Sequence, residues 1–170
     1  MELAQNFSSL VNTSTRSNQS MVDSGQYLTL RLGNEEYAID ILRVQEIRSF
    51  EEPTKMVNSP SFIKGVINLR GVIVPIVDLR LKLNIDIVEY NEFTVVIILN
   101  VRGNIIGAVV DSVADVVTLH SSNIKAAPQF ESALDARFIV GLSNLGQRML
   151  IVMNMEALMS NSEMGIVDSF

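Results

Sequence analysis

Few residues in this sequence could carry out acid–base or nucleophilic chemistry. The only histidine, His120, lies beside Ser121 and Ser122, so a Ser/His pair is the one nucleophilic arrangement to consider. Residues adjacent in the chain rarely share the geometry of a nucleophile and its base, and no G-x-S-x-G nucleophile elbow is present. We therefore interpret His120 as a surface loop residue and expect no catalytic residue in the chain.

Metal and cofactor chemistry has equally little support. The chain contains no cysteine, which removes disulfides, thiolate nucleophiles and Cys-ligated zinc or iron–sulfur centres. The carboxylates are dispersed and do not follow the spacing of a calcium-binding loop, and neither a P-loop nor a G-x-G-x-x-G dinucleotide motif occurs. We expect no metal and no cofactor.

The charge and composition of the chain also restrict its partners. The 170 residues carry a net charge of −6, so no basic field attracts nucleic acid or anionic lipid. Aromatic residues make up 6% with no Trp, which argues against a single-strand reader that stacks bases. Apolar runs such as "TVVIIL" fall short of the ~18 residues of a membrane helix. We expect no nucleic-acid partner, no direct membrane insertion and, without a secretory signal pattern, a cytoplasmic location.

A series of short segments rich in Val and Ile predicts an all-β fold. Gly, Asn, Asp or Ser separates these segments at close intervals, as is typical of strands joined by turns. Continuous apolar runs such as "VIVPIV" and "VVIIL" are predicted to be buried on both faces.

Four hairpins of one form are predicted. Each has a strand, a Gly-containing turn, a second strand and then Asp or Asn. The turn glycines are Gly33, Gly71, Gly103 and Gly146, and the hairpins end at Asp40, Asp78, Asp111 and Asn154. The closest internal match, "NLRG" at 68–71 with "NVRG" at 100–103, suggests two similar β units in one chain.

The residue that ends each hairpin is interpreted as a helix N-cap. A side-chain oxygen of Asp or Asn accepts free backbone N–H groups of a first helical turn, a contribution of about 1 kcal/mol, so capping is favoured over catalysis. In "NMEALMS", Met155, Leu158 and Met159 recur at helical spacing and predict a short C-terminal amphipathic helix packed on the β structure.

The two ends of the chain are predicted to be tails. Residues 1–24 are rich in Ser, Asn, Thr and Gln and have too few apolar residues to offset the entropy of ordering. Residues 161–170 have no sustained periodicity and predict a second, shorter tail. Residues 25–160 are left as the folded domain.

Taken together, the segments "IDILRVQEIR" and "FIKGVINLRGVIVPIVDLR" resemble the CheW family of chemotaxis coupling proteins. Segments "YNEFTVVIILN", "GAVVDSVADV" and "RMLIVMNMEAL" extend the resemblance from about residue 26 to about residue 160. It implies two small SH3-like five-stranded β-barrels packed together. It also implies a non-catalytic scaffold, associated with membrane chemoreceptor clusters, that binds the cytoplasmic tip of methyl-accepting chemoreceptors and the regulatory domain of the histidine kinase CheA.

The resemblance also points to residues that contact these partners: Val44, Glu46, Gly65, Arg70, Val95, Gly107 and Val116. An alternative stands beside most of them, because the three valines also suit the core and the two glycines also suit special backbone geometry. Glu46 and Arg70 are the stronger candidates, since a barrel core has no use for either. If they lie near each other, they would form an ion pair that shapes the binding surface.

Two other functions remain open from the sequence. A CheV-like protein contains a related coupling module inside a longer chain. A small-ligand-binding β-barrel is the alternative of a different class, and it would need polar groups converging on a barrel interior.

Overall fold

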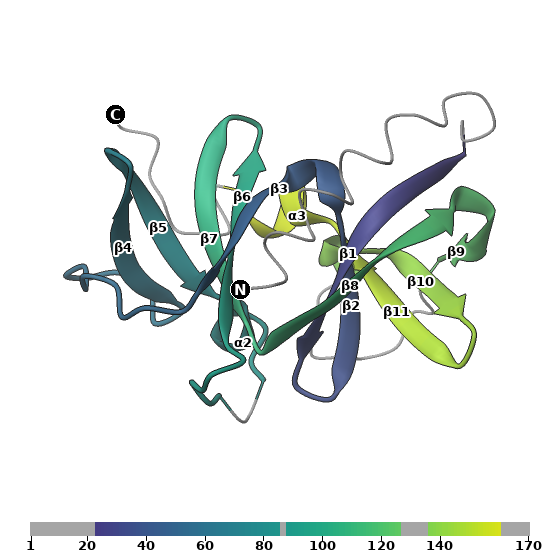
Figure 1. The fold of residues 1–170 in the computed structure, drawn as a ribbon, viewed down its shortest axis with the longest axis horizontal. Coiled ribbons are helices and arrows are strands. Elements are labelled where there is room, and N and C mark those ends of the chain that lie inside the picture. Colours follow the sequence, from purple (N-terminus) through teal and green to yellow (C-terminus); the bar gives the residue numbers. More distant parts are fainter. Residues whose placement is uncertain (1–22, 86–87, 127–135, 161–170) are drawn as a thin grey trace.

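The computed structural model describes residues 23–85, 88–126 and 136–160, which form two β-sheets side by side (Figure 1). Across sheet A the order is β8 (Ser112–His120), β1 (Ser24–Leu32), β2 (Glu35–Asp40), β11 (Arg148–Met153), β10 (Ile139–Leu145) and β9 (Ile124–Lys125). Across sheet B it is β3 (Val44–Ser49), β6 (Val95–Val101), β7 (Asn104–Val110), β5 (Val72–Asp78) and β4 (Ile63–Leu69).

The helices of the described residues are all short. They are η1 (Ile41–Arg43), α2 (Leu79–Lys82), η2 (Ser121–Asn123), η3 (Ala136–Phe138) and α3 (Met155–Leu158). The all-β prediction is therefore confirmed. The predicted tails fall almost wholly outside the described residues, and β1 begins at Ser24, one residue before the predicted domain start.

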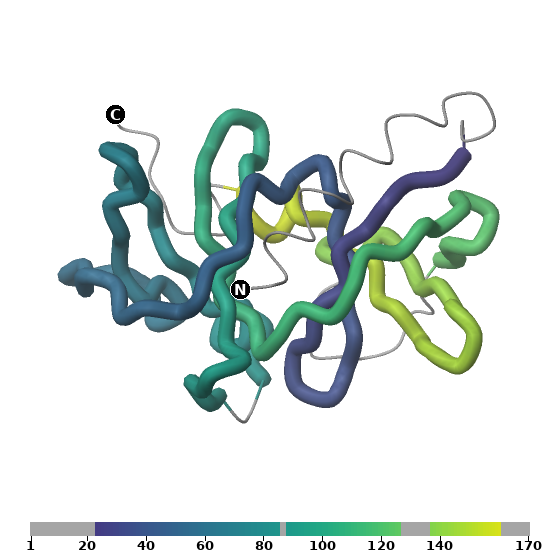
Figure 2. Tube along the Cα trace, viewed as in Figure 1, coloured from purple at the N-terminus to yellow at the C-terminus, as the bar shows by residue number. Residues whose placement is uncertain are grey.

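Each sheet curls into a small barrel because one continuous stretch of chain pairs at both of its edges (Figure 2). In sheet B, the chain leaving β3 reaches Thr54, which exchanges backbone hydrogen bonds of 3.0 and 2.8 Å with Val66 of β4. In sheet A, the chain leaving β8 passes through η2 into β9, which pairs with β10. We call these units barrel A and barrel B. The predicted pair of small barrels is confirmed, with two-residue β9 as a sixth strand in sheet A.

The four predicted hairpins are confirmed as β1–β2, β4–β5, β6–β7 and β10–β11. The glycine in each turn has a φ between 63° and 88°, a region that glycine adopts without strain. In each barrel the second strands of two hairpins pair in parallel, β2 with β11 and β5 with β7. Because paired parallel strands start at the same edge, the two hairpin turns of a barrel lie at the same end.

Three of the four predicted N-caps are confirmed. The side chains of Asp40, Asp78 and Asn154 accept hydrogen bonds from the backbone N–H groups of the helical turns that follow them. The prediction for Asp111 is wrong, because the chain after it continues directly as strand β8. Pairing of β8 with β1 satisfies those backbone groups instead, which leaves the Asp111 carboxylate for other donors.

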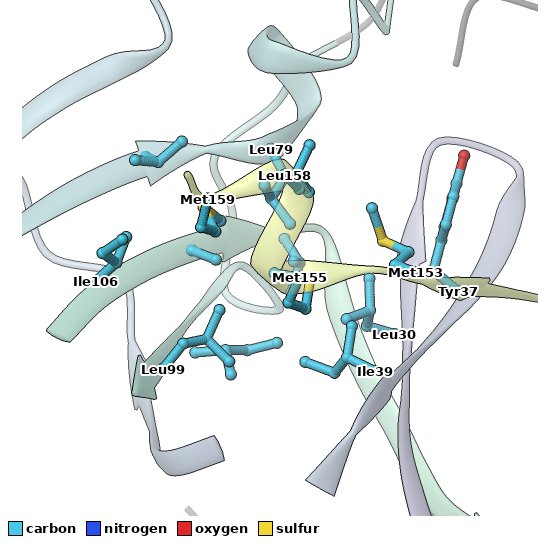
Figure 3. Packing of buried hydrophobic residues seen from close by; sticks show 14 of the residues in the cluster. Leu30, Tyr37, Ile39, Leu79, Leu99, Ile106, Met153, Met155, Leu158 and Met159 are labelled. Atoms are coloured by element: carbon cyan, nitrogen blue, oxygen red, sulfur yellow. The ribbon is translucent and has the colours of Figure 1, made fainter. Parts of the chain in front are cut away.

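Burial on both faces of the central strands explains the continuous apolar runs. Alternate residues of β6 enter different cores: Val96 and Ile98 pack inside barrel B, whereas Ile97, Leu99 and Val101 pack into the largest cluster. That cluster, the junction core, combines residues of β1 and β2 with residues of β5, β6 and β7 (Figure 3). The prediction that "VVIIL" is buried on both faces is confirmed. The same prediction for "VIVPIV" is wrong at Val72 and Ile73, which are 50% and 62% exposed because this end of β5 lies at the hairpin turn.

The C-terminal helix α3 completes the junction core between the barrels (Figure 1). Met155, Leu158 and Met159 are all at most 4% exposed and contribute to this core (Figure 3). The predicted amphipathic helix is therefore confirmed, and its apolar face packs within the chain.

A buried arginine on α2 links the two barrels. Arg80 is 0% exposed, and its guanidinium donates to both carboxylate oxygens of Asp78 at 2.9 Å and to Asp111 at 2.7 Å. Asp111 in turn accepts from the backbone N–H of Gly33, in the β1–β2 turn of barrel A, at 2.7 Å. The same ion network thus includes groups of both barrels.

Tyr90 completes this network and helps to hold Asp78 ionised. Its hydroxyl donates to Asp78 at 2.6 Å, and its ring faces the Arg80 guanidinium. Burial alone would raise the pKa of the Asp78 carboxyl, but hydrogen bonds from Arg80 and Tyr90 outweigh burial and hold that pKa below its ordinary value.

Among the described residues, no helix has the length and hydrophobicity to cross a lipid bilayer.

Replacing Asp78 should destabilise the fold in a pH-dependent way. Asp78→Asn removes the carboxylate that pairs with the buried Arg80 cation, so we expect the free energy of unfolding at pH 7 to fall by about 3–5 kcal/mol. The folded-state pKa lies below the unfolded-state value of about 4, so ionised Asp78 stabilises the fold at any pH above that value. This stabilisation is lost as the pH falls through the depressed folded-state pKa, so the penalty of the substitution should shrink there.

Urea unfolding at pH 7 and at several values below 4 measures this penalty. Asp40→Asn is the matched control, because Asp40 caps η1 in the same way and Asn caps as well as Asp. A penalty below 1 kcal/mol at pH 7 for Asp78→Asn, or one that stays constant down to pH 2, would contradict the assignment.

The glycine in the middle of β4 should tolerate no side chain. A Cβ at Gly65 would lie 2.1 Å from the Thr54 carbonyl oxygen, in the pairing that closes barrel B, and its φ is 143°. We expect Gly65→Ala to lower the free energy of unfolding by about 3 kcal/mol. Gly146→Ala, at φ 63° with open space around the Cβ, isolates the backbone effect and should cost only about 1–2 kcal/mol. Equal losses in thermal or urea unfolding would refute the close-approach argument.

Candidate partner-binding site

The β4–β5 turn places Arg70 at the surface in a strained conformation. Arg70 has a φ of 50° and Gly71 a φ of 88°, and the Asn68 side chain accepts from the Gly71 N–H at 2.8 Å. Positive φ costs an ordinary L-residue about 1–2 kcal/mol, whereas Asn or Gly would adopt it readily. The Arg70 side chain is 71% exposed, so packing does not explain the choice of arginine.

Strand β3 supplies the partner of Arg70. The Arg70 guanidinium donates to Glu46 at 2.7 Å, and Arg48 donates to the same carboxylate at 3.2 Å. The hydrogen bond from Arg70 is the main reason why the pKa of Glu46 lies below its ordinary value, while partial burial opposes the shift. Glu46 and Arg70 therefore lie near each other and form the ion pair expected in that case. At this exposure the pair itself adds only about 0–1 kcal/mol to stability.

Two exposed apolar residues and one further arginine lie close in the chain to Arg70 or Glu46, and the sequence analysis missed them. Val72 and Ile73 directly follow the Arg70–Gly71 turn and are exposed by 50% and 62%. Arg48 lies two residues beyond Glu46 on β3. The available signal was the position of Val72 and Ile73 at the turn end of "VIVPIV", where a strand leaves the core. A charged pair beside exposed apolar groups is typical of protein-binding surfaces.

The three candidate valines pack into the junction core. Val44 begins β3, Val95 begins β6 and Val116 lies in β8, and each is partly buried against that core. Val44 is close in sequence to Glu46, whereas Val116 pairs with Leu28 in barrel A. The structure thus gives all three a packing role and does not gather them around Arg70.

The two candidate glycines are buried and shape barrel B. Gly65 allows the close approach of Thr54, as described above. At Gly107, a Cβ would lie 2.5 Å from Ile76 Cδ1 and 2.9 Å from Val96 Cγ1, inside the barrel B core. Neither glycine presents a surface, so a substitution at either would act through the shape of the barrel.

The interiors of the barrels leave little support for a small-ligand site. Each is filled by its own apolar cluster: Leu69, Val74, Ile76, Val96, Ile98 and Val109 in barrel B, and Ala38, Leu119, Leu150 and Val152 in barrel A. Apolar side chains thus occupy both interiors, whereas a ligand cavity would require polar groups that converge on an open space. In the described ranges, no group of three His, Cys, Asp or Glu residues is arranged to hold a metal ion.

Known proteins are similar to this chain in sequence and in fold. The family model for the CheW-like domain matches residues 26–163. Chemotaxis protein CheW of Klebsiella aerogenes is 51% identical over 144 residues, which cover 85% of this chain and 87% of that protein. A probable chemotaxis protein CheW of Rhizobium etli is 34% identical over 138 residues, which cover 81% of this chain and 89% of that protein.

The fold agrees with these matches. The crystal structure of the scaffolding protein TtCheW from Thermoanaerobacter tengcongensis is similar with a TM-score of 0.75 and 28% identity, over 84% of this chain and 91% of that one. The family model spans most of the chain, and the relatives match over most of their own length. The chain therefore belongs to the family of proteins built on a CheW-like domain, as the resemblance in its sequence indicated.

Proposed function

We propose that this chain is a non-catalytic scaffold that couples methyl-accepting chemoreceptors to the histidine kinase CheA in chemotaxis. Its membership of the CheW-like family supports the chemotaxis role, and the name of the related TtCheW describes a scaffolding protein. The observation that carries the proposal at residue level is the exposed Arg70–Glu46 pair, held on a rigid turn and bordered by exposed Val72 and Ile73.

The geometry of this surface suits binding without chemistry. Arg70 has five N–H donors, and its single hydrogen bond to Glu46 leaves most of them directed to solvent. Glu46 keeps its second partner, Arg48, so Arg70 can turn toward another carboxylate without leaving Glu46 unpaired. A partner docked here would meet a fixed charge and a small apolar patch.

Coupling further requires that partner contacts differ between signalling states, since equal contacts would transmit no control. We infer that residues 25–160 form the coupling domain and that it acts at the cytoplasmic tips of clustered receptors. Glu46 and Arg70 make direct contacts in this proposal. Val44, Val95, Val116, Gly65 and Gly107 act indirectly, by fixing the barrels that present those contacts.

An enzymatic function has no comparable support. His120 ends β8 as an exposed residue, and Ser121 and Ser122 are exposed in the following turn η2. No hydrogen bond between His120 and either serine hydroxyl supports a nucleophile–base pair. His120 and the two serines thus add no support to the catalytic alternative.

Replacing Arg70 should weaken coupling in a reconstituted system. We expect Arg70→Glu, in a mixture of this protein, a chemoreceptor cytoplasmic fragment and CheA, to reduce receptor-controlled phosphorylation and to weaken partner binding about tenfold or more. Loss of one charge-assisted hydrogen bond, about 1.5–3 kcal/mol, accounts for such a change. Arg70→Gln should show a smaller loss in the same direction.

Arg31→Gln is the matched control for Arg70→Gln, because Arg31 is an exposed arginine of β1 in the other barrel. Circular dichroism establishes that each variant is folded. Unchanged control by a folded Arg70→Glu protein would refute the site, and failure of the unmodified chain to bind either partner would refute the function.

A further inference from the structure

The β6–β7 turn repeats the geometry of the Arg70 turn. In "NVRG" the Asn100 side chain accepts from the Gly103 N–H at 2.9 Å, as Asn68 does from Gly71 at 2.8 Å. Arg102 has a φ of 52°, matching the 50° of Arg70. The internal sequence match is therefore also a structural one, with an exposed arginine at the same position of both turns.

Arginine at these two positions is not explained by the turn itself. The described residues contain four non-glycine positions with positive φ, and the other two, Asn58 and Asn84, have the residue type that tolerates this conformation. Arg102 is 77% exposed and Arg70 is 71% exposed, so burial does not account for them either. A strained residue at an exposed turn leads to the hypothesis that its side chain has a role outside the fold.

Arg102 is also not needed to neutralise its partner. It donates to Glu156 of α3 at 3.0 and 3.2 Å, but Arg43 of η1 pairs with the same carboxylate. The arrangement parallels Glu46, which is shared by Arg70 and Arg48. In both clusters the turn arginine can leave while the glutamate stays paired.

The two turns lie at the same end of barrel B because β5 and β7 are parallel (Figure 1). We call this the arginine end, defined by Arg43, Arg48, Arg70, Arg102, Glu46 and Glu156. The four arginines carry one positive charge more than the carboxylates of Glu46, Glu156 and the neighbouring Asp40, on a chain whose net charge is −6. At the arginine end, cationic side chains therefore outnumber anionic ones, unlike in the chain as a whole.

We propose that Arg102 is a second docking residue, and that the arginine end binds one partner segment that presents carboxylate side chains to Arg70 and Arg102 together. The planar guanidinium matches a carboxylate through paired N–H donors, and the exposed guanidinium of the arginine in each turn is available for this contact. The acidic remainder of the chain disfavours a phosphate backbone, so the occupant is an acidic segment of a protein. This inference rests on the proposed coupling function and extends its binding surface.

Binding assays with the full chain test the proposal. Dissociation constants for a chemoreceptor cytoplasmic fragment and for CheA are measured separately for the unmodified protein, Arg102→Gln, Arg102→Lys and the control Arg31→Gln, at low and high salt. We expect Arg102→Gln to weaken binding of one of the two partners about tenfold at low salt, and less at high salt because screening weakens the exposed charge pair. Arg102→Lys should retain part of the affinity, and Arg31→Gln should retain all of it.

A turn-compatible variant separates binding from folding. Asn suits positive φ better than Arg, so Arg102→Asn should melt at an equal or higher temperature while binding the partner as weakly as Arg102→Gln. If the unmodified chain binds its partners and the Arg102 variants bind both equally well, this inference is overturned while the coupling function stands. If the unmodified chain binds neither partner, the coupling function fails first, and the inference fails with it.

Discussion

The buried guanidinium of Arg80 is the constraint on which the arrangement of the two barrels depends. A charge removed from water must be surrounded by acceptors, or the fold loses several kcal/mol. Barrel B supplies Asp78 and the Glu89 carbonyl, and the Asp111 carboxylate joins them while it accepts from Gly33 of barrel A. The barrels cannot separate or rotate at this point without breaking charge-assisted hydrogen bonds, so their relative orientation is part of the folded state.

Burial of apolar surface in the junction core also requires the two barrels to stay together. Because β6 packs Val96 and Ile98 inward and Ile97 and Leu99 outward, its outer face would be exposed if barrel B stood alone. Barrel A and helix α3 cover that face, and the apolar surface buried there stabilises the pair at roughly 25 cal/mol per Å². The two units therefore fold as one body, which gives the surface turns a rigid base.

Local signals in the sequence predicted the parts of this fold that depend on neighbouring residues. The hairpins, the glycines with positive φ and three of the four caps follow from turn chemistry. The family resemblance singled out Glu46 and Arg70, and the structure shows that the two form an ion pair. Arg80 was missed because "DLRLKL" has the pattern of an ordinary amphipathic turn, with its arginine on the polar side. Its burial is set by Asp111 and Tyr90, which fold back from later in the chain, and those distant pairings have no signature near Arg80. Distant pairing also explains why Asp111, predicted to cap a helix, instead accepts a hydrogen bond from Gly33 of barrel A.

The ion cluster of Arg43, Arg102 and Glu156 connects the arginine end to both barrels and to the junction core. Arg102 belongs to barrel B, Glu156 lies on α3 directly after the last strand of barrel A, and Arg43 lies on η1, which connects the barrels. On the same short helix, Met155 and Leu158 face the junction core. A partner carboxylate that draws Arg102 away from Glu156 therefore changes the charge balance at the helix that covers the contact between barrels. A coupling protein responds to a partner through such shared contacts, because a ligand shifts a conformation only by binding its alternatives unequally. In this chain the single helical turn α3 carries both Glu156, which pairs with the arginines, and the apolar residues that pack into the junction core.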